Sequence, residues 1–163
     1  MKSETIVFDH LPGSVEDLKN FPEYALTTPF MAAALAVAIC CHYDNNRDEM
    51  YDMLDAIKGP RPLTNMEKQF LRDRLGGKEY VPFSYFEGTS PQNNYEPTKP
   101  YTITVSDNPY SYQNEGYATL YVKSTGADSP RPIQLRRKGE QWFLWELTCL
   151  ADIRKPAKDD EWA

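Results

Sequence analysis

Residues 132–148 read PIQLRRKGEQWFLWELT and decide the fold, because they have the pattern of two β-strands joined by a two-residue turn. Glycine in the first central position, at Gly139-Glu140, is typical of a type II′ turn, whose twist matches that of paired strands. This turn predicts three pairs of facing residues: Leu135 with Leu144, Arg137 with Trp142, and Ile133 with Glu146. The hairpin is the feature from which the rest of the fold can be worked out.

Side chains alternate between the two faces of a strand, so the hairpin has two faces of different character. One face is apolar and is predicted to join the core: Ile133, Leu135, Trp142 and Leu144. The other face mixes polar and aromatic residues: Gln134, Arg136, Phe143 and Trp145. On this second face, which we expect to be half covered, Arg136 is placed to stack on an aromatic ring.

Upstream of the hairpin, three helices are predicted between residues 28 and 75. The segment 30–43 is apolar all round and rich in alanine, so we expect it to be the central, buried helix. Residues 47–58 have the spacing of an amphipathic helix, with Gly59 in the position of a C-terminal cap. A capping-box pattern at Thr64 and Glu67 begins a third helix that runs to about Leu75.

Two further strands are predicted, at 101–105 and 118–124, so that with the hairpin they form an antiparallel meander of about four strands. The apolar patch at residues 6–8 either adds a short strand or packs across the helices. The fold class is therefore α+β, with an N-terminal helical layer packed on a C-terminal antiparallel sheet. The element order also fits a nuclear-transport-factor-2-like cone, which would leave a pocket between sheet and helices.

A single domain over residues 1–163 accounts for the whole chain, with helices at about 15–75, strands at about 101–148 and a frayed tail at 155–163. Between helices and strands, residues 80–100 contain four prolines and no sustained periodicity. Their many aromatic side chains predict an ordered loop rather than a disordered linker. Two interpretations stay open: the loop is a recognition surface, or its aromatic side chains only anchor it.

Composition limits the possible partners. The formal net charge of −6 is unfavourable for nucleic-acid binding, because no chain-wide positive field attracts phosphates. A local basic patch around Arg131 and Arg136–Lys138 is compatible with a binding site or with a solvated strand face. We expect no membrane partner, since the longest apolar run, 29–41, is shorter than a bilayer span. Three cysteines without a disulfide pattern and no leader-like segment predict a cytoplasmic protein.

Motifs that carry catalysis are absent from the sequence: it has no nucleophile elbow, phosphate-binding loop, dinucleotide fingerprint or zinc-protease motif. The two histidines, His10 and His42, have no ligand spacing, and Cys40 and Cys41 lie in the apolar helix, where a thiol is a small buried side chain. We therefore predict no metal, no cofactor and no catalytic residue.

The sequence predicts a non-catalytic binding or interaction module that uses the aromatic-rich loop. The candidate binding residues combine aromatic rings, amides and guanidinium groups, the types enriched at recognition surfaces. They are Arg72, Tyr85, Asn94, Tyr95, Arg131, Arg136 and Trp145. The alternative is a small-molecule enzyme with a pocket between sheet and helices. Either a protein or a small molecule could be the partner, and the oligomeric state is open.

Several stretches of unusual wording occur together: KGPRPL (58–63), FLRDR (70–74), YVPFSYFEGTSPQNNYEPTKPYTITV (80–105), GADSPRPIQLR (126–136) and WFLWE (142–146). In this combination the chain resembles an uncharacterised bacterial single-domain family, a domain of unknown function. The resemblance extends over most of residues 28–156. It implies a single-domain bacterial protein and no catalytic residue or activity.

Overall fold

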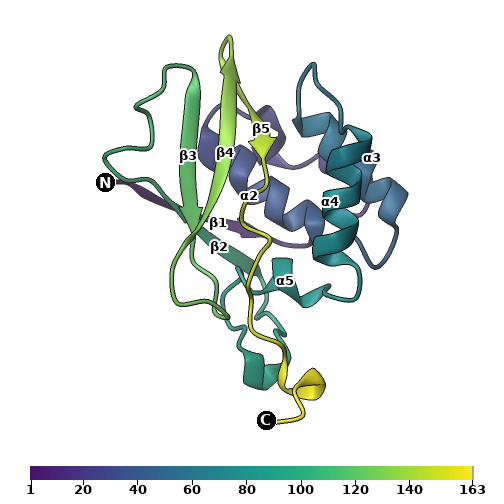
Figure 1. Cartoon of the computed structure of the whole chain (residues 1–163). Helices are drawn as coiled ribbons and strands as arrows, with labels where there is room; N and C mark the ends of the chain where they lie inside the picture. The colour runs from purple at the N-terminus through teal and green to yellow at the C-terminus, as the bar shows by residue number, and fades with distance from the viewer. Residues whose placement is uncertain (163) are drawn as a thin grey trace.

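Helix α2 (Pro29–Cys40) lies at the centre of the structure, a computed structural model that describes residues 1–162 (Figure 1). Every residue of α2 except Met31 is buried, as expected for a helix with no polar face. The helix begins where the side chain of Thr28 accepts a hydrogen bond from the backbone N–H of Met31 at 3.2 Å. Its alanines allow close approach, and α2 contacts all five strands of the sheet.

The sheet is a curled antiparallel meander in the order β1-β2-β3-β4-β5 (Figure 1). Its strands are β1 (Ser3–Phe8), β2 (Tyr101–Ser106), β3 (Tyr117–Val122), β4 (Arg131–Lys138) and β5 (Gln141–Glu146). The apolar patch at residues 6–8 belongs to β1, which pairs with β2 along its whole length. The α+β class is confirmed, with this additional strand at the N-terminal edge of the sheet.

The hairpin has two of its three predicted pairs: Leu135 faces Leu144, and Arg137 faces Trp142. The third prediction, Ile133 opposite Glu146, is wrong. A β-bulge shifts the register, so that Gln134 lies opposite Glu146. One extra residue on β5 before this pair produces the shift, and such a bulge is set by local packing that the alternation of side chains does not reveal.

Helix α2 covers the sheet, because it contacts every strand, and the remaining helices mainly contact α2 or one another. They are α1 (Val15–Leu18), α3 (Arg47–Ile57), α4 (Asn65–Leu75) and α5 (Tyr80–Phe83), with 3₁₀ turns η1 (Pro22–Ala25), η2 (Pro91–Asn93) and η3 (Ala157–Asp159). The capping box that begins α4 is formed as predicted: Thr64 and Glu67 exchange side chain to backbone hydrogen bonds of 3.0 and 3.1 Å.

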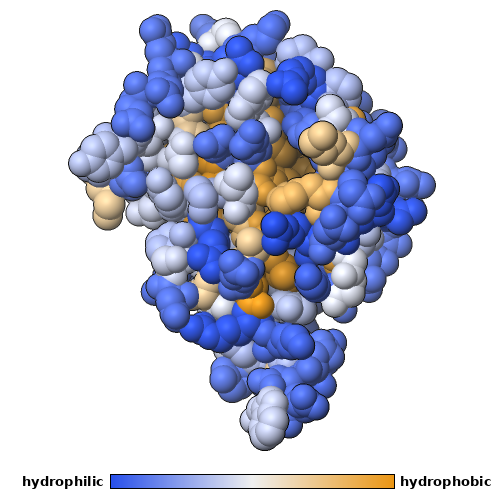
Figure 2. All heavy atoms as spheres, in the orientation of Figure 1, coloured by the Kyte–Doolittle hydropathy of each residue, from blue (hydrophilic) through white to orange (hydrophobic). Residues whose placement is uncertain are grey.

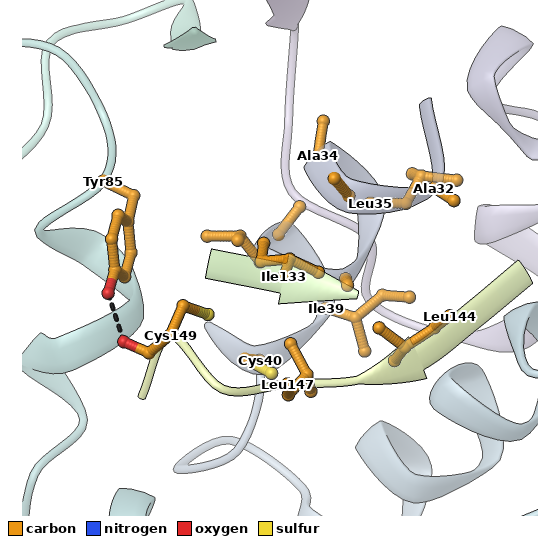
Figure 3. Packing of buried hydrophobic residues seen from close by; sticks show 14 of the residues in the cluster. Ala32, Ala34, Leu35, Ile39, Cys40, Tyr85, Ile133, Leu144, Leu147 and Cys149 are labelled. Carbon is orange, nitrogen blue, oxygen red and sulfur yellow. Dashed lines mark hydrogen bonds between the residues drawn. The ribbon is translucent and has the colours of Figure 1, made fainter. Parts of the chain in front are cut away.

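No open pocket separates α2 from the sheet, because the side chains of both elements fill the space between them. Figure 3 shows Leu35 and Ile39 of α2 beside Ile133 of β4 and Leu144 of β5, and all four are buried. The pocket that a cone-shaped fold would leave in this position is occupied by α2. Any ligand site in residues 1–162 must therefore be sought at the edges of this core.

Candidate functional site

A groove of about 280 Å³ lies between the α3–α4 connection and the β4–β5 hairpin. Its walls come from residues far apart in sequence: Lys58, Pro60 and Arg61 on one side, and Arg136, Arg137, Lys138, Phe143, Leu144 and Trp145 on the other. We call this the cationic groove, because five of these nine residues are lysine or arginine. The lining contains no carboxylate.

Two guanidinium groups stack on a single indole ring in the cationic groove. The guanidinium carbons of Arg61 and Arg136 each lie 4.6 Å from the ring centroid of Trp145. The ring of Tyr117 on β3 packs edge to face against the same indole, with 5.8 Å between the ring centroids. The guanidinium carbon of Arg136 lies 5.1 Å from the Tyr117 ring centroid. A stacked guanidinium keeps its N–H donors in its own plane and available, so the stack orients two donor forks without using their hydrogen bonds.

Most of these cations have no acidic partner. Within residues 1–162, none of Arg61, Arg136, Arg137 and Lys138 forms an ion pair, whereas the nearly buried Lys58 is paired with Glu67 at 3.0 Å. Burial works to raise the pKa of Glu67, but hydrogen bonds from Thr64 and Lys58 outweigh it and lower the pKa. The remaining four positive charges face solvent together.

The cationic groove adjoins a small, mainly apolar cavity of about 40 Å³, which we call its floor. The floor shares Lys58, Leu144 and Trp145 with the groove and is also lined by Leu63, Phe70, Leu71, Leu147 and one carboxylate, that of Glu67, which is paired with Lys58. Figure 2 shows hydrophobic side chains in a hollow on the face that carries β5 and α4 in Figure 1, with hydrophilic side chains around it. A ligand here would meet leucine and tryptophan below and positive charge at the rim.

Of the predicted binding residues, the structure brings Arg136 and Trp145 together in this groove. Arg131 lies elsewhere, where its guanidinium donates to the carbonyls of Ala151 at 3.2 Å and Asp152 at 3.1 Å and holds the C-terminal segment. Arg72 is exposed on α4 and donates to Gln69 at 2.8 Å within its own helix. Neither residue lines the cationic groove.

The predicted loop residues lie at a separate place, and their side chains are used to anchor the loop. The hydroxyl of the buried Tyr85 donates to the carbonyl of Cys149 (Figure 3), and that of the buried Tyr95 donates to the carbonyl of Arg154 at 2.6 Å. Burial raises the pKa of Tyr95 to about 12. Asn94 accepts a hydrogen bond from the backbone of Lys158 at 3.0 Å. The Tyr85 ring is therefore buried away from any partner, whereas Asn94 and Tyr95 line a separate pocket of about 290 Å³ beside Tyr80 and Lys158.

Seven groove residues were not among the predicted binding residues: Lys58, Pro60, Arg61, Arg137, Lys138, Phe143 and Leu144. One close contact joins the two walls. Gly59 follows α3 with a φ of +68°, and a methyl group built on it would lie 3.0 Å from the ring of Phe143. A glycine after a helix usually indicates only a left-handed backbone conformation. The sequence therefore does not reveal the second role of Gly59, which is to leave room for the Phe143 ring of the hairpin.

Groups suited to acid–base or metal chemistry are engaged elsewhere. His10 is bonded to Asp17 at 2.9 Å, and His42 to Glu49 at 2.7 Å. Burial raises the pKa of the Cys40 and Cys41 thiols well above their usual value. Throughout residues 1–162, histidine, cysteine, aspartate and glutamate side chains do not gather in threes as a metal-ligand set. The helices of this range are also too short or too polar to cross a bilayer.

Fold and groove together define a small α+β protein with a cationic, aromatic-walled surface groove. The chain belongs to the family described as Domain of unknown function (DUF6935), which matches residues 10–157. The matched range includes both walls of the groove. No curated protein and no solved structure matches the chain.

Proposed function

We propose that this protein binds an anionic small molecule with an apolar or aromatic body in the cationic groove, without transforming it. The observation that carries the proposal is the set of four neighbouring cations without acidic partners, two of them stacked on Trp145. Carboxylate, sulfonate and phosphate groups are the natural acceptors for such donor forks. The leucines of the floor suit the apolar part of the ligand.

The size of the groove supports a small molecule as the ligand. Its volume of about 280 Å³ is close to the lower end of the range of about 300–1,000 Å³ found for ligand pockets. The net charge of −6 supports a compact anion rather than nucleic acid, whose long phosphate backbone would meet repulsion beyond the groove. We place this binding in the cytoplasm, a proposal supported by three free, buried cysteines.

Binding is favoured over catalysis because the groove lining offers hydrogen-bond donors and apolar surface, and because the one carboxylate of the floor, Glu67, is paired with Lys58. An enzyme built from the predicted residues Tyr85, Arg72, Arg136 and Trp145 would need these four side chains around one pocket. Tyr85 is buried beside Cys149 and Arg72 is exposed on α4, so these four residues do not surround a common space.

The test uses anilinonaphthalene sulfonate, a fluorescent anion with aromatic rings, and phenylnaphthylamine, its neutral counterpart. We expect saturable binding of the anion and much weaker binding of the neutral dye. Replacing both stacked guanidiniums, in the variant R61Q/R136Q, should weaken anion binding by about tenfold or more, since each lost charge-assisted contact is worth about 1 kcal/mol or more.

The matched control is R47Q/R72Q, which removes the same charge from two exposed arginines of α3 and α4 that line neither the groove nor its floor. This control should bind the anion as the native protein does. An equal loss of dye affinity in both variants would show that net charge rather than the groove governs binding. Equal affinity for the charged and the neutral dye would show that the groove does not select anions.

A further inference from the structure

An acidic aromatic segment lies near the end of the described chain. Residues 159–162, Asp159-Asp160-Glu161-Trp162, form what we call the acidic tail segment. The side chain of Trp162 is 89% exposed. Asp160 and Glu161 form no ion pair with any residue in the 1–162 range. The segment thus presents an indole and unpaired carboxylates to solvent.

The segment is held in position at its start. The backbone N–H of Lys158 donates to Asn94 at 3.0 Å, and that of Trp162 donates to the Asp160 carboxylate at 2.9 Å. The first contact ties the residue before the segment to Asn94, and the second fixes the turn within the segment. Figure 1 places the C-terminus at the opposite end of the molecule from the β4–β5 hairpin, so the segment does not reach the cationic groove of its own chain.

The acidic tail segment and the cationic groove are chemically complementary. The segment carries carboxylates next to one large apolar ring, and the groove carries unpaired guanidiniums above an apolar floor. This is also the chemistry of the proposed ligand, an anion with an aromatic body. We propose that residues 159–162 of one copy dock in the cationic groove of a second copy.

Such a contact joins two different surfaces, so it is heterologous and adds copies head to tail. The segment is short, and the buried area falls well below the roughly 1,200 Å² of stable complexes, so association is weak and reversible. It depends on exposed charges and therefore weakens with salt. Because the inference uses the groove of the proposed function, an anionic ligand should compete with the segment and dissociate the assembly.

Sedimentation velocity over a range of protein concentrations at low salt tests the docking. We expect the native protein to increase in average mass with concentration, and W162A and R61Q/R136Q each to remain monomeric. Mixing these two variants should restore association, because one supplies an intact groove and the other an intact segment. Y110A, which removes another exposed ring, and D44N/D52N, which removes two charges, should associate as the native protein does.

Native protein that stays monomeric at the highest concentration, or association that survives W162A, would overturn the docking. So would a mixture of W162A and R61Q/R136Q that remains monomeric. The outcome is separable from the proposed function, because W162A keeps its groove and should bind anilinonaphthalene sulfonate with native affinity. If the native protein did not bind the dye, the small-molecule proposal would be refuted, whatever the oligomeric state.

Discussion

Replacing Gly59 by alanine should be more damaging than the same change at Gly77, although the two glycines occupy equivalent places. Each is the second residue after a helix, and their φ angles are +68° and +71°. A methyl group at Gly77 meets nothing within 4 Å, whereas one at Gly59 lies 3.0 to 3.2 Å from three atoms of the Phe143 ring. The pair therefore separates backbone strain from steric contact with the hairpin.

Backbone strain alone should cost G77A about 1 kcal/mol of unfolding free energy, because a left-handed alanine costs about 1–2 kcal/mol and the less flexible unfolded chain offsets part of it. G59A carries the same strain and must also displace Phe143 by a few tenths of an ångström. Overpacking costs about 1–3 kcal/mol in a full core, and the half-buried Phe143 places this contact near the lower end. We expect G59A to lose about 2–3 kcal/mol in total.

Urea unfolding of native protein, G59A and G77A measures the difference, provided the denaturant slopes agree. The difference of about 1–2 kcal/mol between the variants corresponds to a shift in melting temperature of about 2–8 °C for a chain of this size. G59A should also bind anilinonaphthalene sulfonate less tightly, because Phe143 is a groove wall. If G59A and G77A were equally stable, the Gly59 loop would not pack on the hairpin and the groove would have no second wall.

Three further predictions concern the interior and the pH dependence. Y85F should lose about 1–2 kcal/mol of unfolding free energy in urea, because the buried carbonyl of Cys149 loses its hydrogen-bond donor. Its affinity for anilinonaphthalene sulfonate should be unchanged. A loss of dye affinity with intact stability would indicate that the loop belongs to the binding site. Burial raises the pKa of Cys40 well above its usual value and that of Cys149 to about 12. The stability gained by keeping these thiols protonated is fully present below the unfolded pKa of cysteine and is lost at higher pH. The unfolding free energy should therefore fall as the pH rises above about 9. An unfolding free energy that stays constant up to about pH 11 would contradict this. The hydrogen bond from His10 lowers the pKa of Asp17. The stability that this bond contributes is present above the unfolded pKa of about 3.9 and is lost as the pH falls through the lower folded pKa. D17N should therefore flatten the fall of unfolding free energy at acidic pH, and an unchanged fall would exclude a contribution from the His10–Asp17 pair.

The central helix and the hairpin turn were predictable because local sequence determines them. A run of small apolar residues such as 30–40 has no polar face to expose, and α2 is buried on every side. Glycine at position 139 has a φ of +63° and no second left-handed residue follows it, as a type II′ turn requires. Both features depend on residues that are neighbours in the chain.

The bulge and the groove could not be predicted in this way, because each depends on packing between distant segments. Arg61 and Arg136 are 75 positions apart (136 − 61) and meet on Trp145 because α3, which precedes Arg61, packs beside β5. The aromatic loop stays a prediction as a recognition surface: Tyr85 and Tyr95 direct their hydroxyls inward to backbone carbonyls, while Asn94 and Tyr95 also line a pocket of about 290 Å³. Composition does not distinguish an anchor from a contact surface, and burial does.

Electrostatics gives a reason to regard the cationic groove as functional rather than structural. The chain has 24 acidic and 18 basic residues, so acidic partners are in excess. Within residues 1–162 only four lysines and arginines pair with an acid, namely Lys2, Lys19, Arg154 and the groove residue Lys58, so the distinctive feature of the groove is that four unpaired cations are adjacent. Four adjacent like charges without such partners repel one another and contribute no ion-pair stability. An arrangement that costs stability while acids are in excess is the kind that binding sites retain, and it becomes favourable once an anion neutralises it.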